Sequence, residues 1–519
     1  MKKIRVLIYA ALLIFSGFSV LKAQENTVNS ITLEPDKAQT TISKDIYGQF
    51  AEHLGRCIYE GIWVGENSPI PNTHGYRNDV LAALKDLNIP VLRWPGGCFA
   101  DTYHWKDGIG PKDKRASIVN VNWGNVTEDN SFGTHEFLNL CEMLGCDAYI
   151  SGNVGSGTVQ EMAEWLEYMT SDNISPMTNL RKQNGREKPW KVKYFGIGNE
   201  AWGCGGNMTP EYYSDLCRRY GTYINYAGRG VQKVASGASD LNLNWTDVVM
   251  KNVGTRVQGI GVHYYTLPGN WQSKGSATDF KQDAWFTVLR KTLVMDSLIS
   301  KHLRVMDKYD KKKEVGLMVD EWGTWYDVEP GTNPGFLFQQ NTLRDAMVAA
   351  LNLNIFNKHA DRVKMANIAQ MINVLQAMIL TKKDQIVLTP TYYVFRMYKV
   401  HQNATLIPLE VSCKDYKYED ESIPSISVSA SKDASGKIHI TLANLDPNTE
   451  SPVTIDLATI KSSSITGEVI TSKEMNDYND FGSAPKVAPA KFDKFKQTGN
   501  KLLVNMPSKS IVALEIISK

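Results

Sequence analysis

The 519-residue sequence lacks the signals of several protein classes. It has no HExxH sequence and no CxxC pair, so the spacing of its seven cysteines indicates no structural zinc site. The odd number of cysteines leaves at least one free thiol, and a bridge between Cys141 and Cys146 stays open. No basic block stands out, which makes nucleic acid a poor partner candidate. After the N-terminal region no apolar run is long enough to span a bilayer, so no membrane association is expected.

The N-terminus has the pattern of a secretory signal peptide. Lys2, Lys3 and Arg5 precede an apolar run, and Ala23 is a small residue suited to a cleavage site. No cysteine follows the run directly, which argues against a lipoprotein anchor. The pattern predicts a signal peptide over residues 1–23 and an exported protein, periplasmic or secreted. Removing this segment takes away four of the 57 basic residues and leaves the 55 acidic ones, a net charge of −2.

The middle of the chain alternates short apolar runs with amphipathic helical stretches. Helical patterns such as those over 77–88 and 209–224 separate eight strand-like runs: 46–53, 91–97, 147–155, 193–200, 232–239, 259–265, 315–323 and 363–373. This alternation predicts a (β/α)8 TIM barrel over residues 46–390. A doubly wound open sheet is the alternative, but no GxGxxG follows the first strand to favour it.

The pattern changes after residue 391. Segments such as SISVSASKDASGKIHITLANL alternate apolar and polar residues and are broken by Asp, Gly, Pro and Asn. This predicts a C-terminal antiparallel β-sandwich domain over residues 391–519. Residues 24–45 include SITLEPDKAQTTIS, which has the same pattern, so this N-terminal segment is expected to contribute strands to the sandwich.

Polar and ionisable side chains stand where the predicted barrel strands end. Chemistry in such barrels sits at the carboxyl ends of the strands, where an active site would be assembled. These ends carry Glu52, His53, Cys98, Asn153, Asn199, Glu200, Ser236, His263, Tyr265, Asp320, Glu321 and Gln370.

Two of these acids fit one chemistry. Glu200 ends the fourth strand in KYFGIGNE and Glu321 ends the seventh in VGLMVDEWG. Alone, each has an unremarkable interpretation, as a loop carboxylate or a strand-end charge that faces solvent. Together at one barrel mouth they match glycoside hydrolysis, in which one carboxyl group protonates the leaving oxygen and the other attacks the anomeric carbon.

The neighbouring residues suit a sugar site. Asn199 is placed to bond the hydroxyl beside the reacting carbon, and Tyr265 to donate to the nucleophile. His263 is either catalytic or a buried imidazole bonded to a neighbouring group. The indoles that follow the two acids, Trp202, Trp322 and Trp325, either stack on sugar or pack loops.

Two strand ends allow other chemistries. Cys98 follows two glycines and is a nucleophile, a sugar contact or a packing residue, and no His–Asn or His–Asp pairing supports the first. Glu52 and His53 together would suit a metal, but Glu52 as a hydroxyl-binding carboxylate fits better.

Four motifs together resemble glycoside hydrolase family 51, and among its members the α-L-arabinofuranosidases. They are YGQFAEHLGRCIYEGIWVG (47–65), LRWPGGCFADTYHWKDGIGP (92–111), GNEAWGCGGNMTPEYY (198–213) and DEWGTWY (320–326). The resemblance runs from about residue 31 to the C-terminus, although the last 120 residues match in pattern alone. It implies a (β/α)8 barrel with a β-sandwich, and a retaining double displacement through a covalent glycosyl-enzyme.

The resemblance also implies roles for single residues. Glu200 corresponds to the acid/base and Glu321 to the nucleophile. The residues that correspond to the arabinofuranose subsite are Glu52, Cys98, Asn199, Tyr265 and Gln370, and some relatives have Asn in place of Cys98. No metal and no organic cofactor is implied. The implied partners are arabinose-containing plant polysaccharides and oligosaccharides and, as in many members, further copies of the chain in a hexamer.

Two rival functions remain. An endo-β-glucanase or xylanase on the same barrel would need an open cleft, whereas an exo-acting enzyme needs a pocket closed around one sugar. The insertions over 98–132 and 266–282 are long enough to wall off such a pocket. A non-catalytic polysaccharide-binding protein would be expected to lack Glu200 or Glu321, and both are present.

Overall fold

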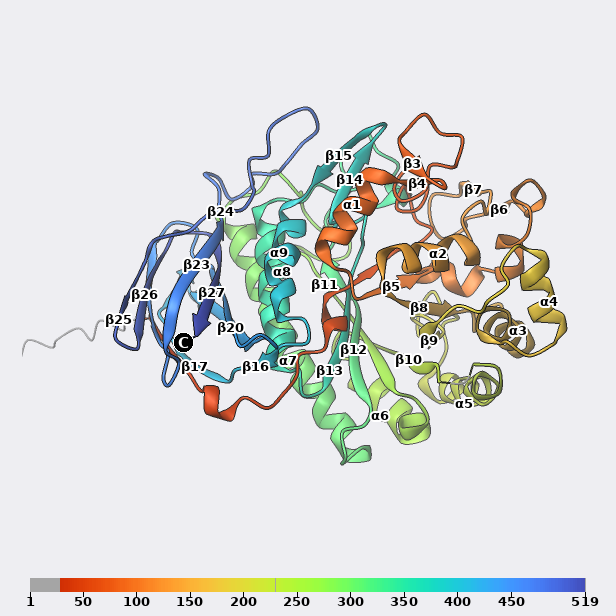
Figure 1. Cartoon of the computed structure of the whole chain (residues 1–519), viewed down its shortest axis with the longest axis horizontal. Coiled ribbons are helices and arrows are strands. Elements are labelled where there is room, and N and C mark those ends of the chain that lie inside the picture. Colours follow the sequence, from red (N-terminus) through yellow and green to blue (C-terminus); the bar gives the residue numbers. More distant parts are fainter. Residues whose placement is uncertain (1–28, 229, 519) are drawn as a thin grey trace, which may run out of the picture.

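The computed structural model describes residues 29–228 and 230–518 of the chain. The predicted signal peptide over residues 1–23 lies outside them. The described residues form a barrel and a β-sandwich that lie against each other, with helices of the barrel between them (Figure 1). None of the helices in this part of the chain has an apolar stretch of membrane-spanning length.

Eight parallel strands close into a barrel, which confirms the predicted fold class. Closure is made by β13 and β2, where Asn367 pairs with Gly48, and this pairing excludes the open-sheet alternative. In barrel order the strands are β2 (Gly48–Phe50), β5 (Val91–Trp94), β8 (Asp147–Gly152), β9 (Val192–Ile197), β10 (Gln232–Ser239), β11 (Gly259–Thr266), β12 (Gly316–Thr324) and β13 (Val363–Ile368).

Helices follow the strands and cover the barrel from outside. They are α1 (Asn78–Leu87), α2 (Thr134–Leu144), α3 (Val159–Thr170), α4 (Pro176–Gln183), α5 (Pro210–Ala227), α6 (Leu243–Val253), α7 (Gln282–Tyr309), α8 (Leu343–Lys358) and α9 (Pro390–Tyr398). α5 begins as its sequence predicts, because the Thr209 side chain accepts from the Tyr212 amide and Pro210 is the first helical residue.

The loops at the carboxyl ends of the strands contain short elements of their own. Three hairpins stand there, each of two strands: β3 (Asn72–Thr73) with β4 (Tyr76–Arg77), β6 (Ile118–Val119) with β7 (Thr127–Glu128), and β14 (Ile379–Lys382) with β15 (Gln385–Leu388). A 3-10 turn over Cys98–Thr102 opens the long insertion after β5.

The sandwich is built from both ends of the chain. One sheet has the order β17 (Leu409–Ser412), β1 (Asn29–Leu33), β22 (Ser451–Asp456), β26 (Lys501–Met506), β25 (Phe495–Thr498). The other has the order β16 (Thr405–Leu406), β20 (Ile426–Lys432), β21 (Ile438–Asn444), β27 (Ser510–Ser518), β23 (Ser462–Ile470), β24 (Ala490–Lys491). A separate hairpin joins β18 (Asp415–Tyr418) and β19 (Glu421–Pro424). β1 pairs with β22 in parallel and with β17 antiparallel, so the N-terminal segment contributes a central strand.

α8 lies between the barrel and the sandwich. Every residue from Leu343 to Asn357 is buried, because one face packs on β12 and β13 and the other on β20, β21 and β27 (Figure 1). Asn354 donates to Ser427 Oγ at 3.0 Å and accepts from Thr441 Oγ1 at 3.1 Å. α9 packs on α8 as well. We therefore propose that the boundary between barrel and sandwich follows α9, one helix later than the boundary predicted between 46–390 and 391–519.

Candidate active site

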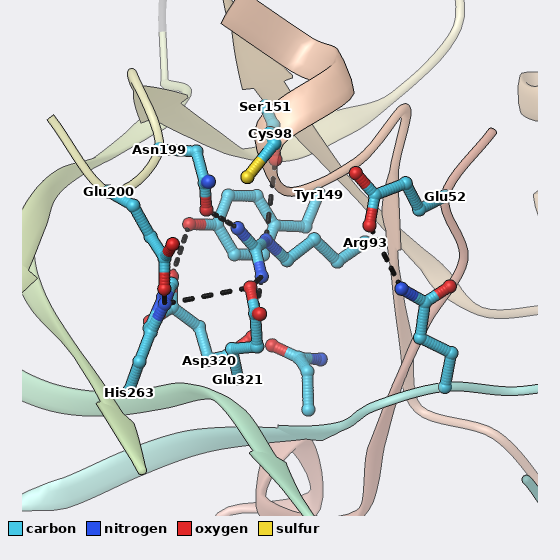
Figure 2. Close-up of polar contacts among 12 residues, drawn as sticks. Glu52, Arg93, Cys98, Tyr149, Ser151, Asn199, Glu200, His263, Asp320 and Glu321 are labelled. Atoms are coloured by element: carbon cyan, nitrogen blue, oxygen red, sulfur yellow. Dashed lines mark hydrogen bonds and ion pairs between the residues drawn. The ribbon is translucent and has the colours of Figure 1, made fainter. Parts of the chain in front are cut away.

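The carboxyl ends of the barrel strands surround a cavity of about 230 Å³. Eight of the nine predicted site residues line it: Glu52, Cys98, Glu200, Trp202, His263, Tyr265, Glu321 and Gln370. They come from β11 and β12 and from the loops after β2, β5, β9 and β13. Asn199, the ninth, is buried beside the cavity and points toward Arg93 (Figure 2).

Glu200 and Glu321 face each other across this cavity. One carboxylate oxygen of each, together with a ring nitrogen of His263, lies within 4.8 Å of the other two atoms. Glu200 begins the turn after β9 in the left-handed region, with φ 41°. Glu321 lies within β12 beside irregular pairing on both sides, between Gly261 and His263 of β11 and between Val319 and Trp322 of β12 itself. Such irregularities re-aim side chains at barrel rims.

Glu321 is surrounded by donors. Arg93 Nη1 donates to its Oε2 at 3.0 Å, and Tyr265 OH donates to its Oε1 at 2.7 Å. The imidazole Nδ1 of His263 lies 3.5 Å from Oε2. A guanidinium and a hydroxyl thus donate to its two oxygens and fix the orientation of this carboxylate, as an attacking group requires.

Glu200 has a different environment. His263 Nδ1 bonds its Oε1 at 2.8 Å, while its Oε2 faces the sulfur of Cys204 at 3.6 Å. Burial raises the pKa of Glu200 and the charge of Glu321 raises it further, against the opposing effect of His263. A carboxyl group with a raised pKa keeps its proton at higher pH, which suits a general acid.

His263 joins the acids to a third carboxylate. Its Nε2 lies 3.4 Å from Asp320 Oδ1, and Tyr149 OH donates to Asp320 Oδ2 at 2.8 Å. Burial lowers the pKa of His263, but the charge of Glu321 and the bonds to Asp320 and Glu200 outweigh it and raise this pKa to about 10. Asp320 is also buried, yet His263 and Arg93 hold its pKa below the usual value. The imidazole therefore carries a positive charge between carboxylates (Figure 2).

Glu52 forms a second polar corner of the cavity. Gln370 Nε2 donates to its Oε2 at 2.9 Å, and Trp123 Nε1 and the Phe99 amide donate to its Oε1 at 2.9 and 3.0 Å. Burial, with the charge of Glu321 as a second cause, raises the pKa of Glu52 to about 7. His53 turns away from it, toward Trp94 and Glu128, so the two do not form a metal pair.

The structure changes two predictions about cysteine. Cys98 is bridged to Cys204, with a Cα–Cα distance of 5.4 Å, so its sulfur is not a nucleophile in this form. Cys141 and Cys146 are both free, and the bridge left open between them is not formed. By spacing, two groups of described residues are suited to hold a metal ion: Cys98, Glu200 and Cys204, and Glu200, His263 and Glu321. In the structure the two sulfurs are bonded to each other and His263 is engaged with carboxylates.

The tryptophans divide into rim and core. Trp202 and Trp325 line the cavity, as expected, and Trp271 stands beside Trp325 with ring centroids 5.3 Å apart. The alternative that Trp322 stacks on sugar is wrong. This residue is fully buried and packs on Phe356 of α8, because side chains alternate along β12 and the neighbour of an inward Glu321 points outward.

Arg93 and Trp123 complete the site and were not predicted from the sequence. Trp123 stands in the 98–132 insertion, where no pattern shows its contact with Glu52. Arg93 carried a usable signal, since a charged residue inside the apolar strand VLRW must find buried anions. Two other strand ends support turns: Ser236 accepts from the Ala201 amide at 3.2 Å, and Asn153 accepts from the Ser156 amide at 2.9 Å.

Comparisons with known proteins agree on one family. The family model "Alpha-L-arabinofuranosidase 1 domain" matches residues 83–279, and "Alpha-L-arabinofuranosidase C-terminal domain" matches residues 320–510. A protein of Bacteroides ovatus named "Intracellular exo-alpha-L-arabinofuranosidase" is 57% identical over 96% of both chains. A "Probable alpha-L-arabinofuranosidase C" of Aspergillus niger is 31% identical over 88% of this chain and 92% of its own. The crystal structure of the GH51 arabinofuranosidase from Xanthomonas axonopodis pv. citri is 50% identical, with TM-score 0.93 over 94% of this chain and all of that one.

The comparisons contradict the prediction of an exported protein. The 57% identical relative from Bacteroides ovatus is named intracellular. The prediction rested on about two dozen N-terminal residues, and a basic start followed by an apolar run is a pattern of charge and hydropathy that is not unique to exported chains.

Proposed function

The chain belongs to the α-L-arabinofuranosidases of glycoside hydrolase family 51, and from this membership we propose how its residues share the reaction. It is an exo-acting α-L-arabinofuranosidase, which removes terminal non-reducing α-L-arabinofuranosyl residues. The endo-β-glucanase or xylanase alternative is not favoured, since the relatives over nearly the whole chain are arabinofuranosidases.

The proposed mechanism is a double displacement with retention of the anomeric configuration. It is carried by one observation: two carboxyl groups within 4.8 Å in unlike environments. Retaining glycosidases hold the two groups about 5–5.5 Å apart, whereas inverting enzymes leave about 6.5–9.5 Å for a water. In the first step Glu321 attacks the anomeric carbon while Glu200 gives its proton to the leaving oxygen. In the second step Glu200 takes a proton from a water molecule, and the oxygen of this water attacks the anomeric carbon and displaces Glu321.

The remaining side chains are proposed to fix the sugar. Glu52, Gln370 and Asn199 would bond ring hydroxyls, and Cys98, His263, Tyr265 and Trp202 would form the wall around the reacting carbon. The cavity of about 230 Å³ lies below the ~300–1,000 Å³ of sites for drug-sized ligands, which suits a single pentose ring and exo action.

The setting of the reaction is also a proposal. Following the intracellular relative, we propose that the enzyme works inside the cell on arabinose-containing oligosaccharides derived from plant polysaccharides. The homo-oligomer, a hexamer by family resemblance, stays a proposal that light scattering of the purified protein tests.

The anomer released first tests the mechanism. The purified protein is mixed with an aryl α-L-arabinofuranoside and followed by proton NMR. Early α-arabinofuranose supports retention with Glu321 as nucleophile. If the β-anomer appears first, the reaction inverts and that role is withdrawn. If no arabinose is released, the activity itself is refuted.

Substitution of the two acids separates their roles. Glu321→Ala should abolish turnover of every substrate, because no covalent intermediate forms. Glu200→Ala should slow arabino-oligosaccharides by about 10²–10⁴-fold, the usual contribution of general acid catalysis. Aryl glycosides with acidic phenols should form the intermediate at nearly the normal rate, since their leaving groups need little proton assistance. Equal losses of the first-step rate on both substrate types would argue against the role of Glu200.

A further inference from the structure

The Cys98–Cys204 bridge is the single disulfide among the described residues, and it lies beside the proposed acid/base. It joins the loop after β5 to the turn after β9 across 106 residues of sequence. The five other cysteines are free, at positions 57, 141, 146, 217 and 413. The bridge thus connects two loops that bear site residues.

The turn after β9 is anchored at its start, where Asp101 accepts from the Asn199 amide at 2.9 Å and Ser236 from the Ala201 amide at 3.2 Å, but its later part has one side chain to hold it. Glycines 203, 205 and 206 surround Cys204, so from 203 to 206 its side chain is the only one available to hold the backbone. The Glu200 carbonyl accepts from the Gly203 and Gly205 amides at 2.7 and 3.1 Å. The position of this short segment is therefore tied to the bridge, and two of its amides in turn hold the Glu200 carbonyl.

The sulfur faces the carboxyl oxygen that His263 leaves free. Cys204 Sγ lies 3.6 Å from Glu200 Oε2, while Oε1 is bonded to His263. A disulfide sulfur carries no hydrogen, so this contact shields the oxygen without donating to it. A thiol in the same place would carry a donor, and a donor to a carboxylate stabilises the charged form.

We propose that the Cys98–Cys204 disulfide is a redox-sensitive positioning element for Glu200, so that reduction by a dithiol selectively slows substrates with poor leaving groups. The inference rests on the acid/base role proposed for Glu200. In the bridged form the carboxyl group keeps its proton and its place. In the dithiol form the tether is lost and a thiol stabilises the carboxylate, which weakens proton donation in the first step.

The exchange is an ordinary two-electron reaction. Cys204 is the exposed partner and Cys98 the half-buried one, so a thiolate of the reductant attacks the Cys204 sulfur. The bond between the sulfurs breaks, and Cys98 leaves as a thiolate and takes a proton. The second thiol of the reductant then displaces Cys204 and closes a cyclic disulfide. The protein gains two electrons and two protons. Thiol reductants are abundant inside cells, where disulfides are rarely permanent.

The test compares oxidised and reduced enzyme on two substrates. The protein is treated with dithiothreitol, and the thiols are counted by alkylation and mass spectrometry. We then measure kcat/KM over pH for an arabino-oligosaccharide and for an aryl arabinofuranoside with an acidic phenol. When reduction has added two thiols to the protein, kcat/KM for the oligosaccharide should fall at least about tenfold near neutral pH. This is a part of the ~10²–10⁴-fold that a general acid contributes. The kcat/KM for the aryl arabinofuranoside should change less than about twofold. The basic limb of the pH profile for the oligosaccharide should move to lower pH.

Two variants control the comparison. Cys204→Ser breaks the bridge without a reductant and should reproduce the reduced behaviour, including the displaced basic limb, with no further response to dithiothreitol. Cys413→Ser removes a free thiol of the sandwich and should behave as the wild type in both redox forms.

Three results would overturn the inference. They are equal losses on both substrates, an unmoved basic limb after verified reduction, or a Cys204→Ser enzyme that matches the oxidised wild type. Failure of the proposed function is distinguishable, because oxidised wild-type enzyme would then release no arabinose before any reductant is added.

Discussion

Arg93 lies on β5, and its guanidinium contacts both segments that bear the two acids, β12 and the turn after β9. Nη1 donates to Glu321 Oε2 at 3.0 Å and to the Asp320 carbonyl at 2.9 Å, and Nη2 donates to Asn199 Oδ1 at 2.5 Å. A planar fork can serve these acceptors at once, whereas an ammonium is a point charge on a flexible stem. The shape of the cation, as well as its charge, therefore fixes the distance between nucleophile and acid/base.

Substituting Arg93 tests this directly. Arg93→Lys keeps the charge but not the fork, and kcat should fall by at least about tenfold because a small misplacement of reacting groups is costly. Arg93→Met leaves Glu321 without its cation and should be slower still. Steady-state kinetics measure both, and circular dichroism shows that the fold is retained. Arg219→Lys, on the exposed face of α5, should match the wild type. A full-rate Arg93→Lys enzyme would refute the positioning argument.

His263 makes a prediction about pH. The first step needs protonated Glu200, so kcat/KM falls as pH rises through the pKa of Glu200. His263 lowers this pKa through its bond and its charge, and since its own pKa is about 10 it stays charged at neutral pH. His263→Gln should therefore raise the pKa of Glu200 and move the basic limb to higher pH, whatever the loss in maximal rate. A basic limb that moves to lower pH would contradict the charge assigned to the imidazole.

Much of the site at this scale was predictable from the sequence. Glu200, Glu321, Glu52 and Gln370 stand at strand ends, so a correct strand assignment places them together. The Cys98–Cys204 bridge was not predictable, because pairing seven cysteines requires distances that no spacing provides.

At the scale of the elements, the turn after β9 requires glycine at one position. A Cβ atom added at Gly205 would lie 1.8 Å from the Asn199 carbonyl oxygen, whereas one added at Gly203 would meet only the Glu200 carbonyl oxygen at 3.7 Å. The two glycines are two residues apart in the same turn, yet one has no space for a methyl group and the other has ordinary contact. Position 205 requires glycine because neighbouring backbone leaves no room for a Cβ atom, and not because the backbone must be flexible there.

This difference provides a matched pair of variants. Gly205→Ala should displace the turn and lower kcat/KM by at least about tenfold, since Glu200 moves with it. Gly203→Ala should keep activity within about twofold. Kinetics on an arabino-oligosaccharide, whose leaving group needs the proton of Glu200, compare the two proteins, together with thermal melts of both. Equal activity of the two variants would show that the turn relaxes without moving Glu200.

The order of strands and helices was also predictable, since apolar runs and amphipathic stretches alternate with barrel spacing. The conformation of the 98–132 insertion was not. Its contacts, such as Trp123 to Glu52, join residues distant in sequence and follow no local period. The burial of α8 on all sides could not be predicted either. Its local sequence does not distinguish a helix that packs on the barrel alone from one that the sandwich also covers.

On the scale of the whole molecule, α8 makes the barrel and the sandwich one structure. Asn354 has both a donor and an acceptor partner on the sandwich, and Asn357 accepts from Tyr47 OH at 3.0 Å and donates to Ser429 Oγ at 3.1 Å. Asn357 is thus hydrogen-bonded both to the residue that precedes β2, at the amino end of the barrel strands, and to a sandwich strand. The site lies at the other end of the barrel strands and takes no side chain from the sandwich, whose role we infer to be stability.

Asn354→Ala should therefore affect stability and leave catalysis unchanged. The substitution leaves Ser427 without its Asn354 partner and Thr441 with His401 alone, at a cost of roughly 1–3 kcal/mol in the free energy of unfolding. Denaturant unfolding measures this, and kcat/KM at 25 °C should stay at the wild-type value. Asn173→Ala, an exposed position after α3, should change neither. A loss of activity without a loss of stability would mean that the sandwich influences the active site.

The position of β1 has a consequence for synthesis. Its two sheet neighbours, β22 and β17, are made roughly 400 residues later, so β1, the first strand of the described residues, leaves the ribosome long before its partners are made. The barrel, by contrast, can close once β13 is made, before most of the sandwich exists. During that interval the face of α8 that the sandwich later covers and both edges of β1 are open to solvent.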